Sequence, residues 1–213
     1  MTRIKKNRPK PVLTVLRLLL ATLSAAAVNP TAAAGQDHPY IAHRFAVSVD
    51  VGNWQPHSLN DEPRFNTFGA AGATPSLRLG LTLPVGHGSG IELAARYWAL
   101  RDLDPTDQVH SLTLIPVSLN LKHWLIPDCF LSAYVIYGAS IYHGTENETA
   151  PLKLTTSGKG WGVNLGAGID LQLSRHFGAG FSVTYYYARF TEPIGGVDDF
   201  SGPCISGRFY LLL

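Results

Sequence analysis

The chain has 213 residues, of which 46% are hydrophobic and only 15% charged, and its formal net charge is +2. This length suits one domain with a substantial core or one closed barrel. The positive charge is concentrated at the start, and the rest of the chain is slightly acidic, so no basic patch remains to indicate nucleic-acid binding. The early basic residues are Arg3, Lys5, Lys6, Arg8, Lys10 and Arg17.

The N-terminal segment has the pattern of an export signal. A basic stretch precedes an apolar run at residues 11–28, and Ala32 and Ala34 supply the small-x-small pattern before Gly35. We expect a cleavable signal peptide at residues 1–34 and a mature domain at residues 35–213. A mitochondrial transit peptide and an uncleaved anchor are the alternatives. No later stretch has the roughly 20 apolar residues of a membrane helix, which excludes a helical membrane protein.

Eight segments of the mature chain have the two-residue periodicity of β-strands. In the first of them, apolar side chains alternate at Phe45, Val47, Val49 and Val51. In the fourth, the apolar positions change from even to odd numbers near Pro116, which predicts a β-bulge there. The segments are residues 43–54, 75–84, 90–100, 109–125, 130–143, 160–173, 177–190 and 200–213.

The connections between these segments alternate between short and long. Short turns join the second segment to the third, the fourth to the fifth, and the sixth to the seventh. The other connections are longer and polar, such as residues 144–159. An antiparallel meander places alternate connections at opposite ends, so one end carries the short turns and the other the long loops. This asymmetry is typical of outer-membrane β-barrels.

One face of the predicted strands is apolar, and the other is rich in glycine and small polar residues. A solvated outer face has no need of so much glycine, whereas the narrow lumen of an eight-stranded barrel does. We therefore expect the polar face to point inward and the apolar face to meet lipid. Seven charged residues on the inward face would form a hydrogen-bonded, ion-paired plug: Asp50, Arg78, Glu92, Arg96, Lys122, Asp170 and Arg208.

Aromatic residues gather at the ends of the predicted strands. Some lie next to the long loops and others toward the short turns, which is the placement of the two aromatic girdles of a membrane barrel. The predicted girdle residues are Trp54, Trp98, Trp124, Trp161, Tyr185 and Phe209.

Two regions resemble a known family. The segment "TLIPVSLNLKHWL" with "LSAYVIYGASIYHG" resembles the central hairpin of small outer-membrane β-barrel domains, often described as the porin family or outer-membrane protein β-barrel. The segments "GWGVNLGAGIDLQLSRHFGAGFSVTYYYARF" and "DDFSGPCISGRFYLLL" resemble its last three strands. The resemblance spans residues 41–213 and implies a Gram-negative outer-membrane location, contact with lipid and lipopolysaccharide, and biogenesis through the barrel assembly machinery. It implies no single activity.

The sequence predicts no catalytic, cofactor or metal site. The eight histidines are scattered, without a pair at the spacing of a helical or hairpin zinc site, and are interpreted as loop and interface residues. Ser140 and His143 have opposite parity, which argues against joint catalysis. Cys129 and Cys204 are expected at opposite ends of the barrel, beyond the distance that a disulfide bridges.

We therefore expect an all-β, eight-stranded antiparallel up-and-down barrel integral to the outer membrane. Its role would be structural or interactive, through four external loops: membrane integrity, adhesion or contact with a small ligand that the sequence does not identify. We expect a monomer without enzymatic activity. Conduction of large solutes is disfavoured because wide channels need about 16 strands. The alternatives are a lipid A-modifying outer-membrane enzyme and a soluble periplasmic lipocalin-like carrier, whose apolar face would point inward.

Overall fold

The computed structural model describes residues 40–60, 74–103, 109–149 and 153–213. The chain divides into two units, Met1–Asp37 and His38–Leu213, and the fold is that of the second unit. The predicted signal peptide lies outside the described residues. None of the described helical turns is long and apolar enough to cross a membrane.

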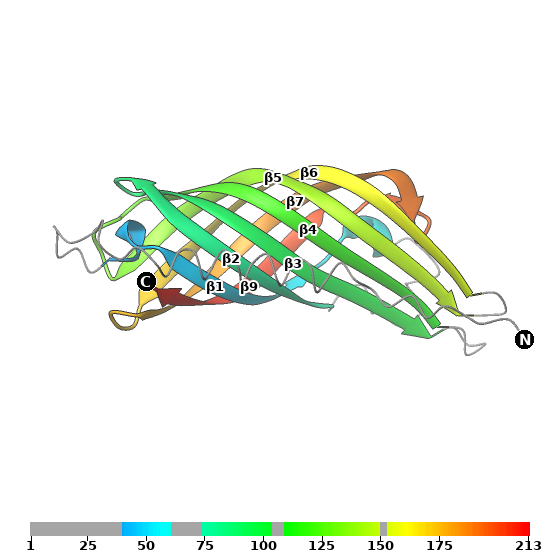
Figure 1. Cartoon of the computed structure of the whole chain (residues 1–213), viewed down its shortest axis with the longest axis horizontal. Helices are drawn as coiled ribbons and strands as arrows, with labels where there is room; N and C mark the ends of the chain where they lie inside the picture. The colour runs from blue at the N-terminus through cyan, green and yellow to red at the C-terminus, as the bar shows by residue number, and fades with distance from the viewer. Residues whose placement is uncertain (1–39, 61–73, 104–108, 150–152) are drawn as a thin grey trace, which may run out of the picture. The chain divides into compact units, whose positions relative to one another are not determined.

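The second unit is built from antiparallel β-strands (Figure 1). Strands β1 to β7 pair in chain order, and β9 lies between β7 and β1, so eight strands form a ring and β8 pairs with β7 alone. The elements are η2 (Ile41–His43), β1 (Ala46–Trp54), η3 (His57–Asn60), β2 (Pro75–Gly86), β3 (Ser89–Leu103), β4 (Val109–Trp124), β5 (Leu131–Thr149), β6 (Lys153–Gln172), β7 (Phe177–Ile194), β8 (Val197–Asp199) and β9 (Gly202–Leu212).

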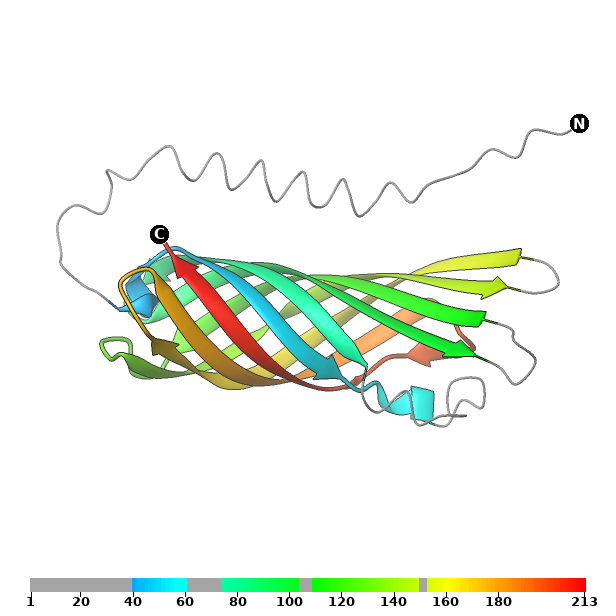
Figure 2. The ribbon, with the colours of Figure 1, turned by 90° about the horizontal axis from the view of Figure 1, so that it is seen from below.

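Pairing between the first and last strands closes the barrel. The β1–β9 ladder runs from Ala46 opposite Leu212 to Trp54 opposite Cys204, and Figure 2 shows β1 between β9 and β2. Closure leaves no free sheet edge in the ring, which is what a β-structure needs in order to span a bilayer. The predicted eight-stranded antiparallel barrel is confirmed.

The apolar face of the strands points outward. Leu165 is 65% exposed and Val183 46% exposed, whereas Asn164 is 5% and Arg78 4% exposed. An apolar exterior of this extent belongs against lipid, and a polar lumen is the reverse of what a lipocalin-like carrier requires. The predicted orientation of the two faces is therefore the one observed.

The connection predicted at residues 144–159 is largely strand. β5 continues to Thr149 and β6 begins at Lys153, with Gly144 opposite Gly158 in the ladder between them. The polar residues of this segment alternate on a hairpin that extends the wall of the barrel. Their polarity reflects contact with water and is compatible with strand structure, so the predicted long loop is wrong for most of this segment.

The β-bulge predicted near Pro116 is absent from β4. Ala95 pairs with Val117 and Trp98 with Leu114, so the register is the same on both sides of the proline. Leu112 and Leu114 are fully buried and point into the lumen. The apparent change of phase arises because the lumen becomes apolar at this level, so that leucines occupy the inward face of β4.

Gly162 and Gly207 differ in the space available for a side chain. A Cβ atom at Gly162, which faces the lumen, would overlap the carbonyl oxygen of Tyr187 and lie 3.0 Å from Cε2 of Tyr142. At Gly207, on the exterior, nothing lies within 4 Å of the corresponding position. We expect Gly162→Val to lower the free energy of unfolding by about 1–3 kcal/mol. We expect Gly207→Val to change it by less than about 0.5 kcal/mol.

Urea unfolding in detergent micelles, followed by the gel mobility of unheated samples, measures both variants. Equal unfolding midpoints for the two would contradict the close approach of β6 and β7 at Gly162.

Candidate functional site

Four charged side chains meet in the lumen, on neighbouring strands. Asp50 of β1 lies opposite Arg78 of β2 and Arg208 of β9 in the two ladders. Its carboxylate accepts a hydrogen bond from Arg78 Nη1 at 2.7 Å and two from Arg208, from Nε and Nη2, both at 2.7 Å. Glu92 of β3 pairs with Arg78 and, at 3.2 Å, with Arg208. Two carboxylates thus neutralise two guanidinium groups, as buried charges require.

A second ion pair lies within an aromatic cage. Lys122 Nζ is 2.6 Å from Asp170 Oδ2, and Trp124 Nε1 donates to the same oxygen at 2.9 Å. Tyr210 donates its hydroxyl to Asp170 Oδ1. The Lys122 ammonium lies 3.8 Å from the centroid of the Tyr134 ring and 4.8 Å from that of Trp124. Cation–π contacts therefore add to the ion pair in stabilising a fully buried lysine.

Neutral side chains extend this network across the lumen. Asn120 donates to Glu92 Oε1 at 3.1 Å, and Asn164 donates to Asn120 Oδ1 at 2.9 Å. Ser140 donates to Asn164 Oδ1 at 3.4 Å and shares a hydrogen bond of 2.7 Å with Ser118. A prediction limited to charged residues did not include these amides and hydroxyls, although their inward parity was visible in the sequence.

Arg96 lies apart from the carboxylates. Its Nη1 donates to Ser76 Oγ at 2.5 Å and its Nη2 to the Tyr186 hydroxyl at 3.3 Å. Its guanidinium carbon is 5.5 Å from the centroid of the Tyr186 ring. Within the described ranges no acidic side chain pairs with Arg96. The expected ion pairing is therefore wrong for Arg96, while the other six predicted residues lie in the two ion-paired groups.

An apolar cluster lies on each side of the polar zone. At the loop end, Trp54 and Trp98 are fully buried with ring centroids 5.8 Å apart, together with Leu112, Leu114 and Ile194. We call this the loop-end cluster. The turn-end cluster consists of Ile41, Ala42, Ala46, Trp124, Tyr134, Ile136, Tyr210 and Leu212. Among the described residues, buried apolar side chains thus occupy the lumen on both sides of the polar zone.

Three of the six predicted girdle residues are inside the barrel. Trp54 and Trp98 have no exposed surface and Trp124 only 5%. Their even positions share the inward parity of Asp50, Arg96 and Lys122, so nearness to a strand end was the wrong criterion. The other three, Trp161, Tyr185 and Phe209, are 60%, 47% and 66% exposed on the exterior, where girdle residues belong.

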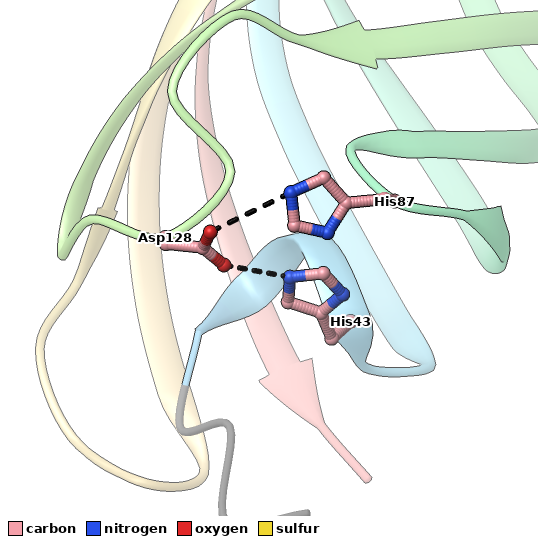
Figure 3. A group of neighbouring side chains, drawn as sticks. All are labelled: His43, His87 and Asp128. Carbon is pink, nitrogen blue, oxygen red and sulfur yellow. Dashed lines mark hydrogen bonds and ion pairs between the residues drawn. The ribbon is translucent and has the colours of Figure 1, made fainter.

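Three side chains that the sequence analysis treated as unconnected meet at the short-turn rim. His43, His87 and Asp128 converge there from three separate segments (Figure 3). Histidine pairs at a fixed, short spacing do not include residues this far apart in sequence. Their shared location at the turn end was the available signal, because His87 and Asp128 lie in short turns and His43 precedes the first strand.

The remaining candidates for chemistry lie apart. Ser140 is buried in the lumen, whereas His143 is exposed on the exterior, so the two do not form a catalytic pair. Cys129 lies in the turn between β4 and β5, Cys204 lies in β9 opposite Trp54, and both are free.

The closed ring, the apolar exterior and the inward-facing polar side chains define the fold of a small outer-membrane β-barrel. Neisserial surface protein A has this fold, with a TM-score of 0.56 and 10% identity over 79% of this chain and 97% of that one. Likeness at this identity establishes the fold. No protein-family model and no curated sequence matches the chain.

Two further solved structures have lower scores. OprG, an outer-membrane protein of Pseudomonas aeruginosa, has a TM-score of 0.48 and 14% identity over 80% of this chain and 94% of that one. Ail, the attachment invasion locus protein of Yersinia pestis, has a TM-score of 0.49 and 12% identity over 79% and 99%. The resemblance to small outer-membrane β-barrels is confirmed for the fold, and the apolar exterior agrees with the predicted outer-membrane location.

The central charge cluster leads to a stability prediction. Asp50→Ala removes the carboxylate that faces both Arg78 and Arg208, and leaves two buried guanidinium groups to share Glu92. We expect it to lower the free energy of unfolding by about 3–5 kcal/mol. Glu192→Ala, at an exposed position on β7, serves as the control and should change it by less than about 0.5 kcal/mol.

Tryptophan fluorescence during urea unfolding in micelles measures both substitutions. An unchanged midpoint for Asp50→Ala would show that the lumen charges do not stabilise the closed barrel.

Proposed function

We propose that the protein is a non-conducting outer-membrane barrel that interacts with molecules outside the cell through the extended hairpins at its loop end. The observation that carries this proposal is the packing of buried side chains in the lumen, in two apolar clusters and the polar network between them. In this proposal the packed lumen does not conduct, and the surfaces left for a function are the two rims and the lipid-facing wall. In this proposal the signal peptide at residues 1–34 directs export, and the turn end faces the periplasm.

The lumen opposes conduction at three successive levels. The loop-end cluster, the network around Asp50 and Glu92, and the turn-end cluster follow one another along the barrel axis. Opening a path would require moving buried tryptophans and separating buried ion pairs. Eight-stranded barrels leave an interior just wide enough for side chains, which supports the same conclusion.

At the loop end, the hairpin of β5 and β6 contacts the turn between β7 and β8. We call the part of this hairpin at residues 146–156 the platform. The hairpin of β5 and β6 reaches past the end of β1 (Figure 2). Glu146 on this hairpin accepts a hydrogen bond at 2.9 Å from the backbone nitrogen of Gly195, in the turn between β7 and β8. Gly195 and Gly196 adopt φ values of 63° and 77°, which favour glycine and shape that turn. A hairpin fixed in this way loses little conformational entropy when it binds a partner.

The enzyme alternative has weak support. A lipid A-modifying enzyme needs a nucleophile and a base within hydrogen-bond distance near the membrane surface. Ser140 points into the lumen and His143 to the exterior, so we propose no enzymatic activity. Outer-membrane lipid and lipopolysaccharide would surround the wall, the barrel assembly machinery would insert it, and the protein would act as a monomer.

Location and conduction can be tested with the same preparation. We expect the protein to stay with the membrane pellet after carbonate extraction and to migrate differently on gels before and after boiling. In planar bilayers it should give no stable conductance steps, because side chains fill the lumen. A soluble periplasmic protein and a 16-stranded porin are suitable controls. Release into the carbonate supernatant, or steps of nanosiemens size, would contradict the proposal.

The platform can be deleted while the eight-stranded ring is kept. Replacing residues 146–156 by Asn-Gly joins Thr145 to Ser157, which already face each other in the ladder, through a two-residue hairpin turn. We expect this variant to keep the heat-modifiable gel mobility of the parent. Cells displaying it should lose binding to an immobilised panel of matrix proteins and glycans that cells displaying the parent retain. At equal display levels, equal binding by the two would contradict an interaction role for the hairpin.

A further inference from the structure

We propose that His43, His87 and Asp128 form a binding site for a divalent transition-metal ion, with Zn²⁺ as the expected occupant, at the short-turn rim of the barrel. The site is independent of the platform at the loop end. Its three residues belong to η2, the β2–β3 turn and the β4–β5 turn, so a bound ion would connect the entry of the chain into the barrel with two turns.

The side chains already converge on one point. His43 Nε2 lies 2.9 Å from Asp128 Oδ1, and His87 Nε2 lies 3.6 Å from Asp128 Oδ2. The two imidazole rings have centroids 5.2 Å apart, and both present Nε2 to the carboxylate (Figure 3). One ligand atom from each residue lies within 4.8 Å of the other two.

This donor set suits zinc. Two imidazole nitrogens and one carboxylate oxygen are a recurrent three-ligand set for Zn²⁺, with the fourth position left to water or another ligand. Zinc–ligand bonds of about 2.0–2.2 Å in a tetrahedral arrangement place the ligand atoms about 3.3–3.5 Å apart. Small rotations of these rim side chains bring the three ligand atoms to this spacing. Mg²⁺ is a poor fit because it prefers oxygen ligands and retains its waters.

The backbone that carries His43 is anchored in the barrel. Ile41 and Ala42 of η2 are buried in the turn-end cluster, and the nitrogen of Arg44 donates to the carbonyl of Ile41 at 3.2 Å. Farther on, Leu213 donates its nitrogen to the Phe45 carbonyl at 2.9 Å. His43 therefore projects from a segment held at both sides.

The two turns are held against each other. The nitrogen of Trp124, at the end of β4, donates to the Gly88 carbonyl at 2.8 Å, and Gly88 has a φ of 74°, which favours glycine. Ser132 Oγ lies 2.8 and 2.9 Å from the carbonyl oxygens of Ile126 and Cys129, which share its one hydroxyl hydrogen, and this contact shapes the turn around Asp128. A metal would thus meet ligands whose backbones are already in place, which lowers the entropic cost of binding.

The group is open to water. The side chains of His87 and Asp128 are 72% and 50% exposed, and that of His43 is 20% exposed. Ions can reach it from the aqueous phase, and substitution of His87 removes a ligand without removing packed core. An ion that binds only the folded barrel would also stabilise it by mass action.

The test uses protein purified from membranes without a histidine tag. Titration calorimetry with ZnCl2 should show one site per chain, and Co²⁺ should give the visible absorption of a nitrogen- and oxygen-ligated ion. We expect His87→Ala and Asp128→Asn each to weaken Zn²⁺ binding by about tenfold or more. Zn²⁺ should raise the unfolding temperature of the parent and leave that of the two variants unchanged.

Two controls separate this site from nearby donors. His176→Ala removes an exposed histidine at the same rim outside the group, and Cys129→Ser removes the thiol next to Asp128. Both should bind Zn²⁺ as the parent does. The proposal is overturned by a parent that binds no Zn²⁺, by undiminished binding in His87→Ala, or by loss of binding in Cys129→Ser. Heat-modifiable gel mobility confirms that each variant is folded.

Discussion

The position of Asp50 between Arg78 and Arg208 links the charges of the lumen to the closure of the barrel. Asp50 lies on β1, which pairs with β2 on one side and with β9 on the other, and its partners stand directly opposite in both ladders. A slip of one residue in either ladder would turn charged side chains toward lipid. The ion pairs therefore favour the one register that closes the ring, and closure in turn satisfies the backbone inside a membrane.

The correct predictions from the sequence rest on parity, that is, on whether a residue has an even or an odd position in its strand. A period of two is a local property, so the eight strands and the inward face could be predicted from the residues. The same rule places Trp54, Trp98 and Trp124 inside, since each shares the parity of a charged lumen residue on its own strand. Nearness to a loop predicts a girdle position for all three, but the two-residue period of the strand decides which way the side chain points. Trp161, on an odd position of β6, has the outward parity of Leu165.

A pattern of inward and outward positions does not predict how the composition of the lumen changes along the barrel axis. The pattern distinguishes inward from outward positions, but it does not show that the inward positions of β4 change from Lys122 and Asn120 to Leu114 and Leu112. The change was therefore interpreted as a bulge. The partners of Arg96 are not predicted by the pattern for the same reason. They depend on its position along the barrel axis, where the lumen presents the hydroxyl groups of Ser76 and Tyr186.

The two rims of the barrel are built differently. At the loop end, Glu146 on the long β5–β6 hairpin accepts a hydrogen bond from the backbone nitrogen of Gly195 in the turn between β7 and β8. At the turn end, η2 closes the barrel with Ile41 and thereby carries His43 to the turns that bear His87 and Asp128. The packing of η2 in the turn-end cluster thus also places one of the three proposed ligands, His43, next to the two turns that carry the others.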